Sequence, residues 1–534
     1  MTTPSQRRIG VLLATRSRIM IPSQRADSAR RQVRSTLIGT CLLVFVLLIG
    51  GRSDHAVAAG DRPDPPPMPD APASNADGEW TPIDLASALR LAGVRNLQLV
   101  IAQQRVEAAV AGQQLAAAQI LPNLNLGTNY DSHTGVLQQP TGEILSVDRS
   151  ALYVGAGTFA VGAGTVQIPG LQYNVNISVG IFNYLVSRQI TTQSRFDRQA
   201  VDNAVLLDVA IAYSNLLRSA GARRLAILTR NDAGEVARLT AANAKAGQGR
   251  QADANRAATE LARRDQDVSE AEARLAQASH RLCELLNLET TTRLRPLESQ
   301  VVPEPIVPTQ IPLPELLATA LLHRPELMAR RAAVKAALLE LRSAKVLPFS
   351  PTVLAGFSDG AFGGGSSIGA AAGEPRFGNL YDRSDLDVVL YWTLRNLGVG
   401  NKALIDAARA RLGESQLEEL VVLDRVREEV AAAYVRTHTR FAEIDRQAQA
   451  VRSGTDAMRE DLIRVRGQKG LPIELLDSLR QVATARTEYL DAIIGFNQAE
   501  FQLYVALGTP PADTLARPVP DELMHPPAQI LTPK

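Results

Sequence analysis

One stretch of the chain alternates polar and apolar side chains for ten residues: Tyr173-Asn174-Val175-Asn176-Ile177-Ser178-Val179-Gly180-Ile181-Phe182. Successive side chains of a β-strand point to opposite faces, so this stretch predicts a strand with one apolar and one polar face. A transmembrane barrel needs such strands, about 9–11 residues long, and the asparagines suit a water-filled lumen. An amphipathic strand in a soluble sandwich would have the same pattern.

Three further stretches have the same period of two. Residues 123–130 and 385–392 alternate well, whereas residues 352–358 alternate less regularly. Gly-rich segments, 131–170 and 358–384, separate the strands of each pair, and we expect long loops there. Neither segment is a phosphate-binding loop, because no Lys-Ser/Thr pair follows its glycines.

A very long helix follows each pair of strands. Residues 183 to about 246 and 397 to about 465 carry heptad-like apolar positions, with charged residues on the other faces. At ~1.5 Å per residue, each helix would be roughly 100 Å long and must pack lengthwise against other helices. A Gly-containing break follows each one, at 247–249 and at 467–470. A helix of about 38 residues then returns, ending near residue 288 or 508.

The two halves of the chain share one plan, which predicts an internal duplication. Each half begins with a helix, 84–120 or 314–346, that ends before a Leu-Pro step, and each continues as strand, loop, strand, long helix, turn and helix. Proline-rich segments separate the halves from each other and from the ends. We therefore divide the chain into a signal peptide with a long basic lead (1–59), a Pro-rich linker (60–83), a first repeat (84–295), a Pro-rich connector (296–313), a second repeat (314–508) and a Pro-rich tail (509–534).

The N-terminus has the pattern of an export signal. Residues 1–58 hold nine arginines and two aspartates, and they include one apolar run, 37–51. About 15 apolar residues suit a signal peptide, whereas a membrane helix needs ~20. A retained anchor is the alternative. Cys41 would leave with the signal and Cys283 would be alone, so we expect neither a disulfide nor lipidation. The rest of the chain is mildly acidic, which argues against nucleic-acid binding.

Four strands per chain cannot close a barrel. An open sheet edge in lipid leaves backbone groups unpaired, at a cost of several kcal/mol each. Several chains must therefore pool their strands, and three or more would enclose a lumen. The fold class that we expect is mixed membrane α+β, with a shared β-barrel continued by a long α-helical barrel.

The repeated order of elements resembles the TolC-like outer-membrane efflux protein family (outer membrane factors), over about residues 84–508. The phrases that agree are Ala118-Gln119-Ile120-Leu121-Pro122-Asn123-Leu124, Gly180-Ile181-Phe182-Asn183 and Ala506-Leu507-Gly508. The resemblance implies a homotrimer with a 12-stranded barrel in outer-membrane lipid and a helical tunnel in the periplasm. It also implies docking to a periplasmic adaptor protein and an inner-membrane pump. The long basic lead, the proline-rich linkers and Trp392-Thr393-Leu394-Arg395-Asn396 depart from the family pattern.

Under this resemblance the chain is a passive exit duct of a tripartite efflux or type I secretion system. Its gate would lie at the turns between the long and the returning helices. Glu474 and Asp477 follow the second turn at i and i+3, on one helical face, and Asp253 follows the first. Around a threefold axis these acids would form rings that attract cations, and protonation or a bound cation would favour closure. The alternative is that they are solvated acids favoured by a helix N-terminus.

No enzyme signature is present in the sequence. The six histidines are scattered without metal-ligand spacing, and there is no nucleophile elbow. We therefore expect no catalytic, cofactor or metal site. The competing interpretation is a secreted or periplasmic coiled-coil scaffold without channel activity.

Overall fold

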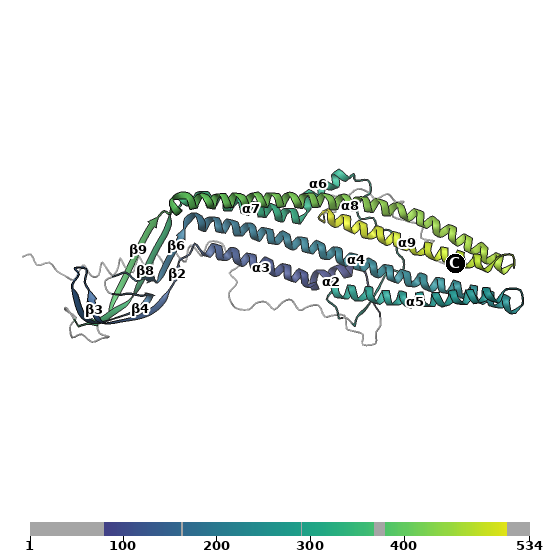
Figure 1. Cartoon of the computed structure of the whole chain (residues 1–534), viewed down its shortest axis with the longest axis horizontal. Coiled ribbons are helices and arrows are strands. Elements are labelled where there is room, and N and C mark those ends of the chain that lie inside the picture. Colours follow the sequence, from purple (N-terminus) through teal and green to yellow (C-terminus); the bar gives the residue numbers. More distant parts are fainter. Residues whose placement is uncertain (1–79, 162–163, 290, 368–379, 510–534) are drawn as a thin grey trace, which may run out of the picture. The chain divides into compact units, whose positions relative to one another are not determined.

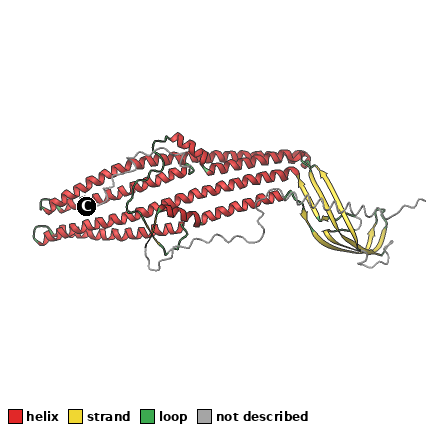
Figure 2. Ribbon diagram, turned by 180° about the vertical axis from the view of Figure 1, so that it is seen from behind, coloured by secondary structure: helices red, strands yellow, loops and turns green. Residues whose placement is uncertain are grey.

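The computed structural model describes residues 80–161, 164–289, 291–367 and 380–509. The predicted signal peptide (1–59), most of the predicted linker (60–83) and the predicted tail beyond residue 509 lie outside these residues. Helices and strands of the described part are labelled in Figure 1 and distinguished by colour in Figure 2.

Two helices are far longer than the others. α4 (Ile177–Lys245) has 69 residues and α8 (Val399–Arg466) has 68, so each rises about 100 Å along its axis. α5 (Gln251–Leu285) and α9 (Pro472–Ala506) return after them, each with 35 residues. The sequence-based prediction of two long helices, each followed by a break and a returning helix, is confirmed.

The helix that begins each half is broken once, where the sequence predicted a continuous one. α2 (Leu85–Arg95) is followed by α3 (Leu97–Ala118), and α6 (Leu313–His323) by α7 (Pro325–Val346). Asn96 makes the first break: its side chain caps α3 by accepting from Gln98 N (2.9 Å) and donates to Leu285 O (3.0 Å). Pro325 causes the second break. Proline suits the first position of a helix and disfavours a helical conformation in the residue before it, here Arg324.

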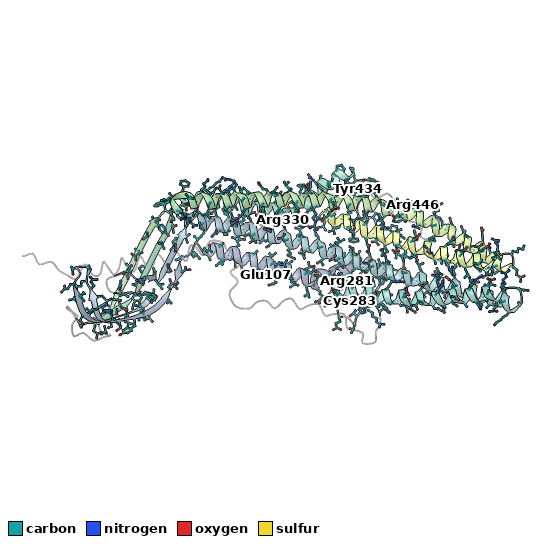
Figure 3. All side chains as sticks on the ribbon, in the orientation of Figure 1. Glu107, Arg281, Cys283, Arg330, Tyr434 and Arg446 are labelled. Atoms are coloured by element: carbon teal, nitrogen blue, oxygen red, sulfur yellow. The ribbon has the colours of Figure 1, made fainter. Side chains whose placement is uncertain are left out.

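The long helices pack lengthwise against the shorter ones. α4 contacts α3, α5, α7 and α9, and α8 contacts α7 and α9. Arg330 of α7, labelled in Figure 3, forms an ion pair with Glu418 of α8 at 2.9 Å. One 18-residue window of α4 is apolar enough to cross a membrane, but 44% of it is buried inside the structure. Contacts with other helices therefore cover part of its apolar surface.

Two apolar cores hold the middle of the helical part together. In the first, α2, α4 and α5 enclose fully buried Leu216, Leu282 and Leu286. In the second, α6, α8 and α9 pack around Val307 and Ile311 of the connector. Full burial of one such side chain contributes about 1.5–3 kcal/mol.

The strands form one sheet of seven segments and one parallel pair. The pair joins β1 (Trp80–Ile83) to β7 (Arg293–Pro296); residues 80–83 are thus a strand at the end of the predicted linker. The sheet segments are β2 (Asn123–Leu124), β3 (Leu126–Gln138), β4 (Ile144–Thr158), β5 (Ile168–Pro169), β6 (Leu171–Asn176), β8 (Thr352–Ser366) and β9 (Tyr381–Tyr391).

Six of these seven segments lie along four lines, and the seventh, β5, pairs with the end of β4. β2 continues into β3, and β8 and β9 are each one line. β4 and β6 share the remaining line, because β8 pairs antiparallel with β6 through residues 352–357 and with β4 through residues 359–366. Among the described residues β3 pairs only with β4, and β9 only with β8. The sheet therefore has two open edges.

Two expectations about the strands were wrong. The predicted strand 173–182 ends at Asn176, whose side chain accepts from Val179 N (3.3 Å) and caps α4, so residues 177–182 are helical. The predicted loop 131–170 contains the end of β3 and all of β4, and β8 and β9 each enter the predicted loop 358–384. Glycine-rich composition hid these strands, since glycine lowers strand propensity without forbidding a strand.

The register divides the sheet into a polar and an apolar face, because directly paired residues share a face. The pairs Gln172↔Gly356, Asn176↔Thr352, Asn129↔Tyr153, Ser358↔Asp385 and Gly356↔Asp387 lie on the polar face. The pairs Leu124↔Leu171, Tyr173↔Ala355, Ala355↔Val388, Phe357↔Leu386 and Val353↔Leu390 lie on the other. The apolar face is also exposed, at 72% for Leu386 and 62% for Val388. Leu354↔Val389 on the polar face and Asp359↔Ser384 on the apolar face are exceptions. The alternation predicted from the sequence is thus confirmed for most of the sheet.

The connector between the halves is tied to α9 by a buried carboxylate. Glu500 is fully buried, and its Oε2 accepts from the backbone N–H groups of Ile306 and Val307, both at 2.8 Å. Burial raises the pKa of Glu500 to about 7, although these two hydrogen bonds act to lower it.

We predict that this carboxylate makes stability depend on pH. Between the ordinary value of 4.5 and about 7, the folded state binds more protons at Glu500 than the unfolded state does. The contribution of Glu500 to the free energy of unfolding therefore falls as pH rises through this window, by up to about 3 kcal/mol, and stays constant above it. Glu500→Gln keeps the accepting oxygen and removes the charge, so its stability should match the wild type at pH 5 and exceed it at pH 8. Denaturant midpoints at both pH values measure this, and parallel pH profiles for the two proteins would contradict it.

Candidate functional site

The turns after the two long helices lie side by side. The first turn covers residues 246–250 and the second residues 467–471. Gly247 (φ 73°) and Gln468 (φ 59°) both adopt the left-handed conformation, which a helix C-terminus commonly requires. Gln468 Nε2 donates to Gln248 Oε1 at 2.6 Å, and Arg466 pairs with Glu235. The two turns are therefore linked within one chain.

An apolar cluster fixes the helices beside these turns. It joins Val236 of α4, Ala257 of α5, Val465 of α8, and Leu475 and Leu476 of α9. All five side chains are buried. Because all four helices contribute, neither helix pair can move away from the other without exposing this cluster.

Glu474 lies in the first turn of α9 with a capping role. Its Oε2 accepts weakly from the backbone N–H of Leu471 (3.4 Å) and lies 3.8 Å from the Arg464 guanidinium. The side chain is 43% exposed. Arg464 thus faces Glu474 across the turn.

Asp477 and Asp253 are also held by neighbours on their own helices. Asp477 is exposed and accepts from Gln481 Nε2 at 2.7 Å. Asp253, in the first turn of α5, pairs with Arg256 at 3.1 Å and has an 18% exposed side chain. The structure thus places Glu474 and Asp477 on one helix and Asp253 on another. Among the described residues, neither a hydrogen bond nor an ion pair joins Asp253 to either of them.

An ion triad around a buried carboxylate, which the sequence did not reveal, links α5 to α9 near these turns. Glu260 is 2% exposed. It accepts from Arg264 Nη2 at 2.7 Å within α5 and from Arg480 Nη2 at 2.6 Å across to α9. Burial acts to raise the pKa of Glu260, but the hydrogen bonds and charges of Arg480 and Arg264 outweigh it and hold the pKa below its ordinary value. The triad therefore stays ionised throughout the neutral range.

Further ion pairs connect the same helices. Arg486 of α9 pairs with Asp232 of α4 at 3.2 Å, and Arg230 of α4 pairs with Asp265 of α5 at 2.9 Å. Burial raises the pKa of Asp232, and the hydrogen bond from Arg486 acts against that rise. The i,i+4 spacing of Glu260 and Arg264 was visible in the sequence, but Arg480 is 220 positions from Glu260. Only the packed structure shows that partner.

The chemistry of the described residues is that of packing and ion pairing. No group of three or more His, Cys, Asp or Glu side chains within them could hold a metal ion. Cys283, labelled in Figure 3, is a free, buried thiol. Burial raises its pKa, which makes the thiol less reactive.

Comparison with known proteins finds similarity in structure only. No protein-family model matches the sequence, and no curated protein matches it. The CmeC outer membrane channel of Campylobacter jejuni is 15% identical with a TM-score of 0.64, over 79% of this chain and 85% of that one. The outer membrane protein VceC of Vibrio cholerae is 16% identical with a TM-score of 0.62, over 79% and 96%. The MtrE outer membrane channel of Neisseria gonorrhoeae, in its open state, is 21% identical with a TM-score of 0.59, over 79% and 88%.

We predict that loss of Arg480 destabilises the helices near the turns. In Arg480→Ala the buried Glu260 carboxylate keeps Arg264 as its remaining partner, so the expected loss in free energy of unfolding is about 1–3 kcal/mol. Loss of every partner of a buried charge would cost about 3–5 kcal/mol. Denaturant midpoints of the purified protein measure the change.

The matched control is Arg459→Ala. Arg459 pairs with Asp456 at 3.1 Å, and the two side chains are 66% and 64% exposed. Removing an exposed pair should cost less than about 0.5 kcal/mol. If Arg480→Ala proved as mild as this control, the triad would not stabilise the structure.

Proposed function

We infer that this chain, which has the fold of the TolC-like outer-membrane channels, is a subunit of an outer-membrane exit duct that conducts solutes passively. The two-faced sheet carries this proposal. One face is apolar and exposed, and the other carries asparagines, glutamine and acids at paired positions. A strand between lipid and a water-filled lumen needs this division.

The open edges support assembly from several copies. β3 and β9 each have one partner strand among the described residues. Lipid cannot satisfy the backbone N–H and C=O groups on their free sides. Three copies would supply a closed ring of 12 strand lines, with the polar faces inward. The matching element order of the two halves supports the internal duplication inferred from the sequence.

The helices support the same assembly outside the membrane. α3 exposes Leu97 (60%) and Leu115 (65%), and α8 exposes Leu417 (65%) and Val421 (68%). Apolar side chains in such number on rod-like helices favour burial against neighbouring copies. In a homotrimer these helices would form a tunnel that continues the barrel into the periplasm.

The rest of the machinery follows from the same proposal. The turn end of the tunnel would face the periplasm, where it would meet a periplasmic adaptor protein and an inner-membrane pump. Tripartite efflux and type I secretion both use such a duct, and the chain would perform no catalysis in either. The exported solute would be chosen by the pump.

The acids after the turns form the proposed gate. Three copies would bring Glu474 and Asp477 around the axis as two acidic rings, with Asp253 on the neighbouring helices. Mutual repulsion of these carboxylates would oppose closure, and protonation or a bound cation would favour it. Within one copy, the linked turns and the apolar cluster around Leu475 would hold these acids in place.

We predict a small, cation-selective conductance for the purified protein in planar bilayers, and a smaller and less cation-selective one for Glu474→Ala/Asp477→Ala. Removing the carboxylates removes the repulsion that opposes closure, as protonation would, and it removes the negative charge that attracts cations. The control is Asp424→Ala/Glu428→Ala, an acidic pair exposed on α8, which should conduct as the wild type does.

The outcomes separate the proposals. A conductance unaffected by the Glu474 and Asp477 substitutions would keep the duct and discard the acidic gate. Failure of folded, oligomeric protein to insert would favour the alternative, a secreted or periplasmic coiled-coil scaffold.

A further inference from the structure

A short hairpin leaves the sheet between β4 and β5. The chain pairs with itself antiparallel there, Gly157 with Pro169 and Thr158 with Ile168. Its two described arms, residues 157–161 and 164–169, are called the inner hairpin below. After it, the chain rejoins the same strand line as β6. The inner hairpin is therefore an interruption of one strand and does not connect two separate strands.

An apolar cluster seats the inner hairpin on the polar face of the sheet. Ala160 and Val166, one from each arm, pack with Tyr153 and Phe362. Tyr153 pairs with Phe362 and with Asn129, so all three lie on the polar face. Asn129 Oδ1 accepts from the backbone N–H of Ala160 at 3.1 Å. Tyr153 and Ala160 are both 0% exposed, so the contact between the inner hairpin and the sheet is fully packed.

Contacts to β8 and β9 place the hairpin on the same face. Arg383, opposite Gly360 on the polar face, donates to Gly164 O and lies 4.8 Å over the Phe362 ring. A Cβ at Gly356 would come within 2.5 Å of Pro169 Cγ. Glycine is thus required at position 356, because the hairpin approaches the sheet so closely there. Every one of these anchors belongs to the face that would line the lumen.

The size of the hairpin can be compared with that of the barrel. Strands about 4.8 Å apart and tilted by about 40° close into a 12-strand ring with a backbone radius of about 12 Å. A layer packed on a sheet lies about 10 Å from it. Three hairpins, one from each copy, would therefore occupy most of the lumen at the level of Tyr153.

We propose that the inner hairpins form a fixed constriction inside the barrel that selects solutes by size. This inference rests on the proposed function. The described residues that the hairpin leaves exposed are uncharged: Phe159, Val161, Gly164, Thr165, Gln167 and Ile168. The nearby Arg383 is paired with Asp385 at 2.9 Å, and both side chains are less than one-fifth exposed, at 16% and 19%. Charge discrimination would therefore come from the acids at the helix turns, and size discrimination from this constriction.

The first test shortens the hairpin. Replacing residues 159–167 with Asn-Gly supplies a two-residue turn that closes the Thr158–Ile168 pair. Single channels are recorded in planar bilayers. Polyethylene glycols of graded size are added on the side of the bilayer that faces the sheet end of the channel, opposite the helices. The single-channel conductance of the shortened variant should be at least about twofold higher than that of the wild type, and the variant should admit larger polymers. The control removes Thr141 from the turn between β3 and β4 and should change neither quantity.

The second test needs no change of backbone. Thr165→Cys, in a Cys283→Ala background, places one thiol on the exposed side of the hairpin. A negatively charged methanethiosulfonate should lower its conductance, whereas labelled Thr141→Cys should conduct as before labelling.

The two proposals fail in different ways. A wild type that forms no channel overturns the proposed function and this inference with it. A wild-type channel with unchanged polymer cut-off after shortening, or with current unchanged after complete labelling of Thr165→Cys, overturns the constriction alone.

Discussion

The rest of this structure depends on the unpaired backbone at two sheet edges. The sheet has partners for β4, β6 and β8 on both sides, but the described chain gives β3 and β9 a partner on one side only. In water these edges would be solvated, whereas in lipid each unpaired group costs several kcal/mol. The apolar face would be unfavourably exposed in water, because Leu386 and Val388 are both more than half exposed. Lipid would cover the apolar face, and neighbouring copies would pair with the two edges, which supports the proposed duct of several chains.

The long helices of the other part are held together by charge pairs as well as by apolar contacts. Long helices with alanine-rich contacts bury little apolar surface per residue, so charge pairs between helices add cohesion and fix which helices meet. Glu260 joins α5 to α9, Arg486 joins α9 to α4, and Glu500 joins α9 to the connector. α9 takes part in all three, and it also carries Glu474 and Asp477 at its start. α9 therefore connects the turn end of the helices with the connector between the two halves.

Most of the architecture could be predicted from the sequence because its signals are periodic and long. The two long helices, the breaks near Gly247 and Gly467, and the polar and apolar faces of the strands all follow from local spacing. Three features could not be predicted in this way. Asn176 continues the alternation of its strand and yet caps α4, so the end of that strand depends on one hydrogen bond. β4 lies in a segment whose glycines suggested a loop, and those glycines serve the close approach of neighbouring strands and of the inner hairpin. The Glu260–Arg480 contact joins residues of different halves, which no local pattern encodes. The proposed gate acids were found by their position after a glycine turn, and the structure gives each of them a local partner.

The most direct test of the account is disulfide cross-linking between the two edge strands. One cysteine replaces Tyr130 in β3, and a second is moved along the outer face of β9, at Leu386, Val388 or Leu390, in a Cys283→Ala background. If β3 of one copy pairs with β9 of the next, oxidation of membranes should yield a covalent ring of three chains at one position of the scan. Control proteins with only one of the two cysteines should stay monomeric on denaturing gels. Monomers alone at every position, from protein that is present in the outer membrane, would contradict the shared barrel.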